Sequence, residues 1–332
     1  MNIIHNVAQY IDELKKYLSE GFYYSYGYDL TASRQRRINF MQEKSKDMLR
    51  IIASDHRYFW NLNLYKDFRD QNVDARWYTP IIQGYVGVAN GKLGNRDLTL
   101  GLISRRSHMR VGTRFHARGI DDSGNVANFV ETEQLVQAEN IVISYTMLRG
   151  SVPVFWEQKG VVENVNLTRG PEITKKAFNK HFEDIITTYG PIYAIDLLSD
   201  TAAREVILTK EYLRQLYDSE FKDRIKFLHL DFHAYCKGDK YDQLKILVAK
   251  VESGITDFGW FVEDVKARKV LKLQTGAFRV NCLDSLDRTN VAQSKIAISI
   301  LQRQLSKLGF NIEEVFSKEV AKEGIAFIDD QK

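Results

Sequence analysis

Residues 277–291 have the sequence AFRVNCLDSLDRTNV, in which an apolar, strand-like start gives way to a polar run typical of a loop. The residues that follow predict a helix with one buried stripe, because apolar or small side chains recur at spacings of three and four. These are Val291, Ser294, Ile298, Leu301, Leu305 and Leu308. The stretch therefore predicts strand, loop and helix in that order, with Thr289 or Asn290 near the helix N-cap.

The loop places a cysteine, Cys282, six residues before an arginine, Arg288. A loop of this length can curl until backbone N–H groups, those of Leu283, Ser285 and Leu286 among them, point at one phosphoryl group. The helix N-terminus adds a positive field. We expect this field to lower the pKa of the Cys282 thiol, while the fork of Arg288 binds two phosphoryl oxygens.

These residues predict phosphoryl transfer through a cysteine. The Cys282 thiolate attacks phosphorus, water resolves the phosphocysteine, and the Thr289 hydroxyl is placed to hydrogen-bond the departing sulfur. Asn281, the last residue of the strand, is grouped with the loop as a substrate contact. A bare Cys-x5-Arg would favour a buried structural cysteine near a helix-capping arginine. The strand before, the helix after and the hydroxyl that follows Arg288 reverse that preference.

Two carboxylates, Asp284 and Asp287, lie inside the predicted phosphate loop. There they would repel substrate and raise the pKa of the thiol unless they are protonated or paired with cations. A protonated carboxyl is a good general acid for a departing alkoxide, and a paired one would orient a cation or water. The alternative is that both cap the helix N-terminus. That alternative is as good as catalysis for Asp287 and weaker for Asp284.

Length and composition bound the rest of the chain. It has 332 residues, of which 44% are hydrophobic and 12% aromatic, so a disordered chain is excluded and about two domains are expected. A Gly/Asn-rich stretch at 90–95 is the clearest break, which places the predicted domains at 1–100 and 101–332. In the second domain, strand-like residues 192–198 and 225–232 flank a helical pattern, and that order is typical of an α/β fold.

Charge and cysteine content exclude several functional classes. The 47 basic and 43 acidic residues leave a net charge of +4, too weak to identify nucleic acid as a partner. Cys236 and Cys282 are the only cysteines, and the seven histidines lack zinc-site spacing, so no metal or other cofactor is predicted. No apolar run approaches the roughly 20 residues that span a bilayer, and no signal-peptide pattern is present. The chain is predicted to be cytoplasmic, and nothing in the sequence bears on its oligomeric state.

A second basic segment lies at residues 110–118, which alternate strictly and predict a strand. One face would carry four cationic or titratable side chains: Arg110, Arg114, His116 and Arg118. This face could receive phosphate groups or anionic lipid headgroups, or it could be a solvated edge. Arg34, Arg36 and Arg37 form a further cluster that could touch an anionic membrane or simply be a wet helix face.

Asp231 and His233 follow a strand-like run at its carboxyl end, where the sites of α/β sheets collect. They would supply a second acid or orient Cys282. The alternative, a satisfied buried pair that closes a turn, is about as good.

The segment from Cys282 to Asn290, CLDSLDRTN, closely resembles the signature of Sac-domain phosphoinositide phosphatases, Cys-x-Asp-x-x-Asp-Arg-Thr-Asn. The resemblance extends in order over nearly the whole chain. The further segments are FYYSY at 22–26, YDLT at 28–31, FWN at 59–61, RFHARG at 114–119, ANFVETEQ at 127–134, RGSVPVFW at 149–156 and DFH at 231–233. The sequences of residues 114–119 and 155–158 are most similar to the Sac domains of synaptojanins.

The resemblance implies removal of the 4-phosphate, and often the 3-phosphate, from membrane phosphatidylinositol phosphates without a metal. It assigns the nucleophile to Cys282 and the phosphate-binding role to Arg288. It also implies a mixed-sheet α/β catalytic domain with a Cys-x5-Arg phosphate loop, preceded by a β-rich α+β N-terminal subdomain. Both are expected to be partial, and the chain is expected to work as a peripheral protein on the cytosolic face of membranes.

Two other functional classes stay open at this point. A protein tyrosine or dual-specificity phosphatase would use the same loop, although the His before Cys282 and the loop glycines typical of that class are missing. A catalytically silent phosphoinositide-binding or scaffold module would keep the fold without turnover, which the intact Cys282 and Arg288 argue against.

Overall fold

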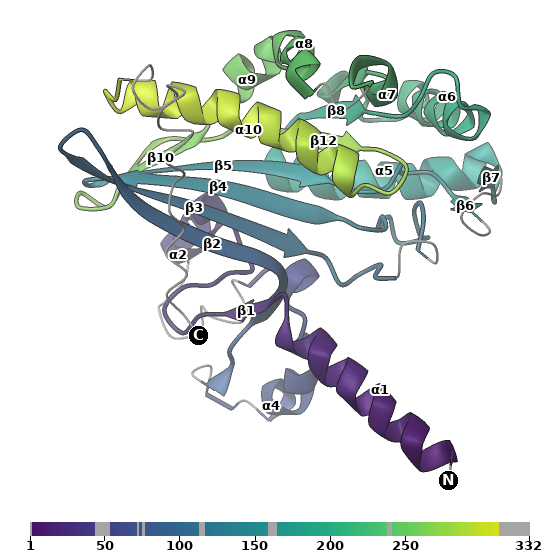
Figure 1. Cartoon of the computed structure of the whole chain (residues 1–332), viewed down its shortest axis with the longest axis horizontal. Helices are drawn as coiled ribbons and strands as arrows, with labels where there is room; N and C mark the ends of the chain where they lie inside the picture. Colours follow the sequence, from purple (N-terminus) through teal and green to yellow (C-terminus); the bar gives the residue numbers. More distant parts are fainter. Residues whose placement is uncertain are drawn as a thin grey trace. The chain divides into compact units, whose positions relative to one another are not determined.

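The computed structural model describes residues 2–43, 54–71, 73–74, 77–112, 117–158, 165–237 and 241–311 (Figure 1). Backbone contacts divide the chain into two compact units. The first comprises Met1–Gly87 and Leu102–His108, and the second comprises Val88–Gly101 and Met109–Lys332. The division at residue 100 expected from the sequence stays a prediction.

The first unit combines helices with the start of a sheet. Its elements are α1 (Asn2–Ser19), β1 (Phe22–Tyr24), α2 (Arg34–Glu43), η1 (His56–Tyr58), η2 (Leu62–Tyr65), α4 (Lys66–Asp70) and parts of β2 (Ile81–Leu93) and β3 (Arg96–Arg106). Strand β1 pairs antiparallel with β2, with Phe22 opposite Gln83. Arg36 forms an ion pair with the buried Asp55, and the Arg37 guanidinium lies 3.7 Å from the Tyr28 ring centroid, so neither side chain is a simple wet surface group.

The second unit is a mixed α/β fold, as the sequence predicts. Its strands are β4 (Val130–Ala138), β5 (Ile141–Arg149), β6 (Trp156–Gln158), β7 (Val165–Leu167), β8 (Ile192–Asp196), β9 (Ile225–His229), β10 (Phe261–Asp264), β11 (Lys269–Lys272) and β12 (Ala277–Asn281). Its helices are α5 (Pro171–Tyr189), α6 (Ala203–Tyr217), η4 (Lys222–Arg224), α7 (Phe232–Tyr235), η5 (Tyr241–Leu244), α8 (Lys245–Lys250), α9 (Glu252–Phe258) and α10 (Asp287–Lys307).

The sheet of this unit is mixed, and its order places four carboxyl ends together. The strands follow the order β4-β5-β12-β8-β9, with β10 also paired to β5. Strand β4 is antiparallel to β5, whereas β12 is parallel to both β5 and β8, and β8 is parallel to β9. The carboxyl ends of β5, β12, β8 and β9 therefore face the same edge of the sheet, where α/β folds build their sites.

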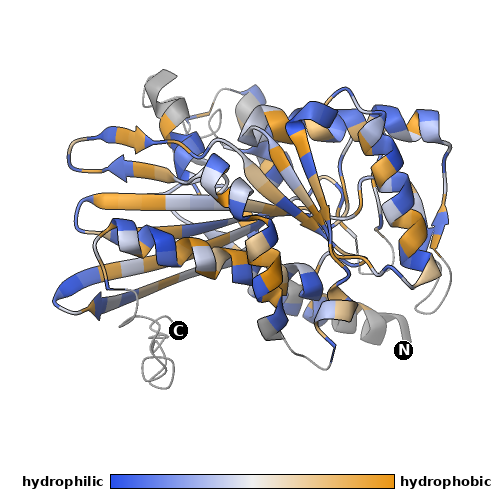
Figure 2. Ribbon diagram, turned by 90° about the horizontal axis from the view of Figure 1, so that it is seen from above, coloured by the Kyte–Doolittle hydropathy of each residue, from blue (hydrophilic) through white to orange (hydrophobic). Residues whose placement is uncertain are grey.

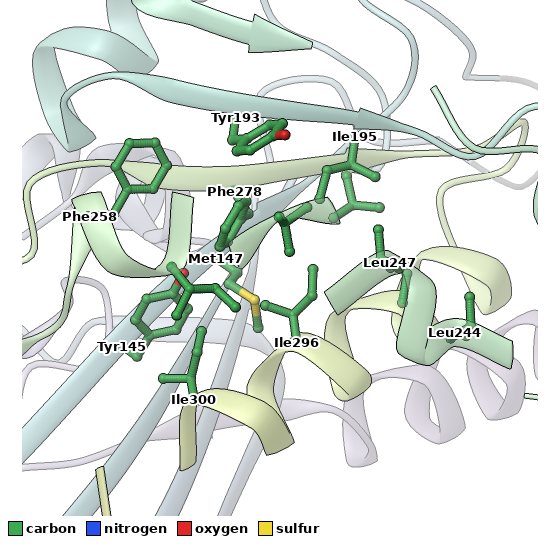
Figure 3. Close-up of a cluster of buried hydrophobic side chains, with 14 of the residues drawn as sticks. Tyr145, Met147, Tyr193, Ile195, Leu244, Leu247, Phe258, Phe278, Ile296 and Ile300 are labelled. Atoms are coloured by element: carbon green, nitrogen blue, oxygen red, sulfur yellow. The ribbon is translucent and has the colours of Figure 1, made fainter. Parts of the chain in front are cut away.

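Strand β12 is buried on both faces, which explains its continuous apolar character. Phe278 and Val280 belong to a hydrophobic cluster with Ile296 of α10 and Leu247 of α8, part of which Figure 3 shows. Arg279 points to the opposite face, where its Nε donates to His181 of α5. The strands at the centre of the sheet are accordingly mostly hydrophobic in Figure 2, while the helices alternate between hydrophilic and hydrophobic residues.

The helix after the signature segment forms as predicted, but its buried face agrees with the predicted stripe only in part. The predicted residues that pack on the core are Val291, Leu301, Leu305 and Leu308. Ala292, Ile296 and Ile300 are fully buried, whereas Ile298 is 44% exposed. Leu305 is the predicted stripe residue that is fully buried. Residues spaced by three and four define several overlapping stripes on a helix, and contact with the sheet selects the one that starts at Ala292.

The strand expected at residues 110–118 is absent from its described part. Residues 109–112 and 117–118 lie outside regular strands, and 113–116, which include Arg114 and His116, lie outside the described residues. Ala117 and Arg118 are both buried, so the predicted division into a cationic and an apolar face is wrong there. Local hydrogen bonding replaces sheet pairing, since Arg110 Nη2 donates to the Arg118 carbonyl at 2.8 Å.

Candidate functional site

The candidate site is the loop that joins β12 to α10. The strand ends at Asn281, Cys282 follows at once, and α10 begins at Asp287 with Leu286 as its N-cap. The N-cap therefore lies three residues earlier than Thr289. The Thr289 hydroxyl donates to the Leu286 carbonyl at 2.8 Å, so it fixes the first turn of the helix.

Cys282 is a free cysteine, 1% exposed, at the centre of this loop. Burial raises the pKa of its thiol, against the lowering effects of the Arg288 charge and of backbone N–H groups from Ser285, Leu286 and Asp284. The Ser285 N–H lies 3.2 Å from Sγ. The amides of Ser285 and Leu286 and the charge of Arg288 thus act on the sulfur, while the expected net lowering of the thiol pKa is wrong because desolvation of the thiolate outweighs them.

The loop backbone is held by polar contacts from neighbouring segments. The Ser285 hydroxyl donates to the Gly150 carbonyl at 2.7 Å, and Arg149 Nη1 donates to the Ser285 carbonyl at 2.5 Å. Asn128 Nδ2 donates to the Asp284 carbonyl at 3.0 Å. Ser285 adopts a positive φ of 54°, which a non-glycine residue keeps only where its surroundings fix it. These contacts turn the loop amides inward toward Cys282.

Arg118 binds the loop from the side, although it comes from a different part of the chain. It is 4% exposed, and its Nη1 lies 2.5 Å from Asp284 Oδ1 and 3.2 Å from the Leu283 carbonyl. Its Nη2 donates to Gln158 Oε1 at 3.1 Å. The ion pair compensates the negative charge of Asp284, which would otherwise repel substrate, because a buried guanidinium at this distance favours the ionised carboxylate.

Arg288 is held by a carboxylate that the sequence analysis missed. Its Nη1 and Nη2 donate to the two carboxylate oxygens of Glu205 at 3.0 and 3.2 Å. Burial lowers the pKa of Arg288, but the Glu205 hydrogen bond and the Cys282 charge raise it by more, so the pKa is raised overall. Glu205 lies in the first turn of α6. An acidic residue just beyond a buried strand was the available signal.

The remaining predicted residues take other positions. Asp287 is exposed in the first turn of α10. Asp231 caps α7 by accepting the Ala234 N–H at 3.0 Å, and its other oxygen accepts the Ser199 hydroxyl at 3.1 Å. His233 is exposed, and within the described part of the chain neither it nor Asp231 contacts Cys282. Asp231 thus closes a turn, as the alternative has it, but the buried pair of that alternative is wrong because His233 is exposed.

Asn281 points away from the thiol into a chain of polar side chains. Its Nδ2 donates to Asp196 Oδ1 at 2.6 Å, and Asp196 Oδ2 lies 3.1 Å from His229 Nδ1. The hydrogen bond to Asp196 raises the pKa of His229 to about 9, against the opposing effect of burial. This series of hydrogen-bonded side chains ends at Asp200, whose Oδ1 lies 2.7 Å from His229 Nε2.

Within the described ranges, no three His, Cys, Asp or Glu side chains form a group that could hold a metal ion. Over the same ranges, no helix combines the length and apolar character needed to cross a membrane.

Comparison with known proteins bears on the whole chain. The family described as "SacI homology domain" matches residues 4–237. The phosphatidylinositide phosphatase SAC2 of Danio rerio is 37% identical over 90% of this chain and 29% of its own length. The polyphosphatidylinositol phosphatase INP53 of Saccharomyces cerevisiae is 36% identical over 86% of this chain and 27% of its own.

A third relative, the phosphatidylinositol-3-phosphatase SAC1-B of Danio rerio, is 33% identical over 94% of this chain and 55% of its own length. The chain therefore spans between about a quarter and about half of the curated relatives named here. Because the family match covers more than half of the chain and the relatives agree with it, the chain belongs to the SacI homology domain family of phosphoinositide phosphatases.

Proposed function

We propose that this chain hydrolyses a phosphate monoester on the inositol ring of membrane phosphatidylinositol phosphates through a phosphocysteine at Cys282. The observation that carries the proposal is the arrangement around the sulfur. Amides of Asp284, Ser285 and Leu286, together with the charge of Arg288, are directed at Cys282 at the carboxyl end of a buried strand. Such a cradle stabilises a dianionic phosphoryl group.

The reaction has two balanced steps. In the first, the Cys282 thiol loses its proton to solvent, its sulfur forms a bond to phosphorus, the bond from phosphorus to the inositol oxygen breaks, and that oxygen takes a proton from an acid. In the second, a water oxygen attacks phosphorus while the deprotonated acid takes a proton from that water, the phosphorus–sulfur bond breaks with its electron pair left on sulfur, and inorganic phosphate leaves. Arg288 and the loop amides hold the phosphoryl oxygens in both steps.

The carboxyl that supplies the proton is proposed to be Asp287. Asp284 is ion-paired with the buried Arg118, which keeps it ionised and suits it to orienting the loop rather than to donating a proton. Asp287 is exposed at the start of α10. Its position in the first turn of α10 is the same end of the helix that carries the loop.

The substrate position proposed is the 4-phosphate, with the 3-phosphate as the second site of attack. Substrates reach the protein as lipids in an anionic membrane surface, on the cytosolic face, and no metal takes part. The support is the family membership and the printed names of the relatives, one of which is a phosphatidylinositol-3-phosphatase.

A second candidate function is supported by one observation. Cys282 is almost completely buried and its thiol pKa is raised, as expected of a module that binds phosphoinositides without turnover. Phosphate release from liposomes, each carrying one monophosphorylated phosphoinositide, separates the two in the presence of a chelator. Turnover by the wild type that is lost in Cys282→Ser while liposome binding persists supports the phosphatase. Equal binding with no release by either protein supports the silent module.

A further inference from the structure

Glu205 and Arg288 form a buried, two-point ion pair beside the candidate nucleophile. The Glu205 side chain is 3% exposed and that of Arg288 is 16% exposed. Each carboxylate oxygen accepts from a different terminal nitrogen of the guanidinium. A third N–H, on Nη1, is directed at the Leu197 carbonyl at 3.5 Å. Three of the five guanidinium donors are thus directed at protein atoms.

The two donors that remain lie on one edge of the guanidinium. They are the Nε–H and the second Nη2–H, and these two project in parallel. A parallel pair of N–H donors matches two oxygens of a phosphoryl group. Because Arg has many rotamers, this edge can be presented to a phosphoryl group in one orientation only if the opposite end of the side chain is fixed. The carboxylate of Glu205 fixes that end.

Glu205 is itself held by the turn that follows β8. The Ser199 N–H donates to Glu205 Oε2 at 2.8 Å. The Ser199 hydroxyl and the Asp200 N–H donate to Asp231 Oδ2 at 3.1 and 2.8 Å. Burial raises the pKa of Asp231, but these donors and the Ala234 N–H lower it by more. The net pKa is therefore lowered, and the carboxylate is ionised at neutral pH. Asp231 therefore ties the turn after β8 to the segment after β9.

We propose that Glu205 is a positioning residue that orients Arg288 for phosphoryl binding, and that Asp231 acts behind it by fixing the Ser199 turn. This inference rests on the proposed function, since it concerns how the same loop holds its substrate. It gives Asp231 a role that needs no contact with Cys282. Neither carboxylate touches the reacting atoms.

The test compares Glu205→Gln with Glu205→Asp and with a matched control. Gln keeps the size of the side chain but removes the charge, and Asp keeps the charge on a shorter stem. The control is Glu252→Gln, because Glu252 forms an equally two-pointed pair with Arg303 on the surface, at 2.8 and 2.6 Å. The readouts are kcat, KM, inhibition by tungstate, and the rate at which Cys282 is alkylated with and without tungstate, followed by peptide mass spectrometry.

We expect Glu205→Gln to lower kcat/KM and weaken tungstate inhibition by roughly 10- to 100-fold, the size typical of groups that support a direct ligand. Glu205→Asp should recover part of both losses, and Glu252→Gln should match the wild type. Asp231→Asn should give a smaller loss that adds nothing in the Glu205→Gln background, because both act through Arg288. A folded Glu205→Gln protein with wild-type kcat/KM and tungstate inhibition overturns the inference.

The arms separate this inference from the proposed function. If the wild type binds tungstate at Cys282 but releases no phosphate, the phosphatase proposal fails, and protection from alkylation still decides the role of Glu205. If the wild type shows neither protection nor release, both fail. Where Glu205→Gln does not fold, Glu205→Asp and Asp231→Asn decide, and wild-type tungstate binding by both contradicts the inference.

Discussion

At the scale of single residues, the proposed reaction depends on the protonation state of the Cys282 sulfur. Burial raises the pKa of the thiol, so the free protein holds it protonated at neutral pH. We therefore expect alkylation of Cys282 to be slow at pH 7 and to rise steeply as the pH is raised through the alkaline range. The pH profile of iodoacetamide labelling measures this directly, with Cys236 read from its own peptide in the same sample. A plateau of labelling already reached at pH 6 would show a thiolate instead.

The second prediction at this scale concerns the two loop carboxylates. Asp287→Asn should lower kcat by about 10²- to 10⁴-fold on a phosphoinositide, the usual contribution of a general acid. The loss should largely vanish on a substrate with an activated leaving group, which needs no proton. Asp284→Asn should lose activity on both substrates alike, because it removes the partner of Arg118. The opposite pattern would assign the acid to Asp284.

Several site residues could be predicted from the sequence for a physical reason. Cys282 and Arg288 lie within one short segment whose strand, loop and helix are set locally, so spacing alone places them together, whereas the Thr289 hydroxyl, expected at the sulfur, donates to the Leu286 carbonyl. Glu205, Arg149 and Asn128 are distant in the sequence, and only the sheet order brings them to the loop. The direction of the Cys282 pKa shift was missed because burial is a property of the whole fold.

At the scale of elements, α10 anchors the loop to the sheet through its buried face. Ile296 is fully buried against β5 and β12, so Ile296→Ala should lower the free energy of unfolding by about 2–5 kcal/mol. Ile298→Ala, on the exposed face of the same helix, should change it by no more than about 0.5 kcal/mol. Urea denaturation of the two variants measures the difference. Equal losses of unfolding free energy in the two variants would mean that Ile298 is as buried as Ile296, and would contradict the buried face described here.

This pair of residues also shows what sequence periodicity can and cannot predict. The pattern correctly indicated a long amphipathic helix, because apolar residues recur with the helical period. It misplaced part of the buried face, since it included the exposed Ile298 and left out the buried Ile296, because which face is buried depends on the angle at which the helix crosses the sheet. The strand predicted at 110–118 is likewise wrong in its described part. The arginines of the alternating pattern, Arg110 and Arg118, make local and loop contacts instead of forming one face of a strand.

The ends of β8 and β9 are joined by His229, which lies between Asp196 and Asp200. Its folded-state pKa of about 9 lies above the value of about 6.5 expected in the unfolded chain. The stabilisation from charged His229 is therefore complete below about pH 6.5 and is lost as the pH rises through about 9.

His229→Gln removes this titration but keeps a hydrogen-bonding side chain. It should lower the melting temperature more at pH 6 than at pH 10, where the wild-type imidazole is neutral. Melting curves at the two pH values test this, with His233→Gln as the exposed control. An equal loss at both pH values would mean that His229 contributes through packing alone.

At the scale of the whole molecule, we propose that four parallel carboxyl ends assemble one phosphoryl-binding site around Cys282. The fold class and the family follow from the sequence, because the signature segment and its companions run through nearly the whole chain. The position of the hydrolysed phosphate does not, since it depends on headgroup contacts that no single segment encodes.

The most direct measurement is to look for the covalent intermediate. The protein is mixed with liposomes that carry phosphoinositide radiolabelled in the ring phosphate, quenched in denaturant during turnover, and digested for peptide mapping. We expect label on the peptide that contains Cys282, none in Cys282→Ser, and none on the peptide that contains Cys236. Phosphate release with no labelled Cys282 peptide, or with equal release by Cys282→Ser, would contradict the proposed phosphocysteine.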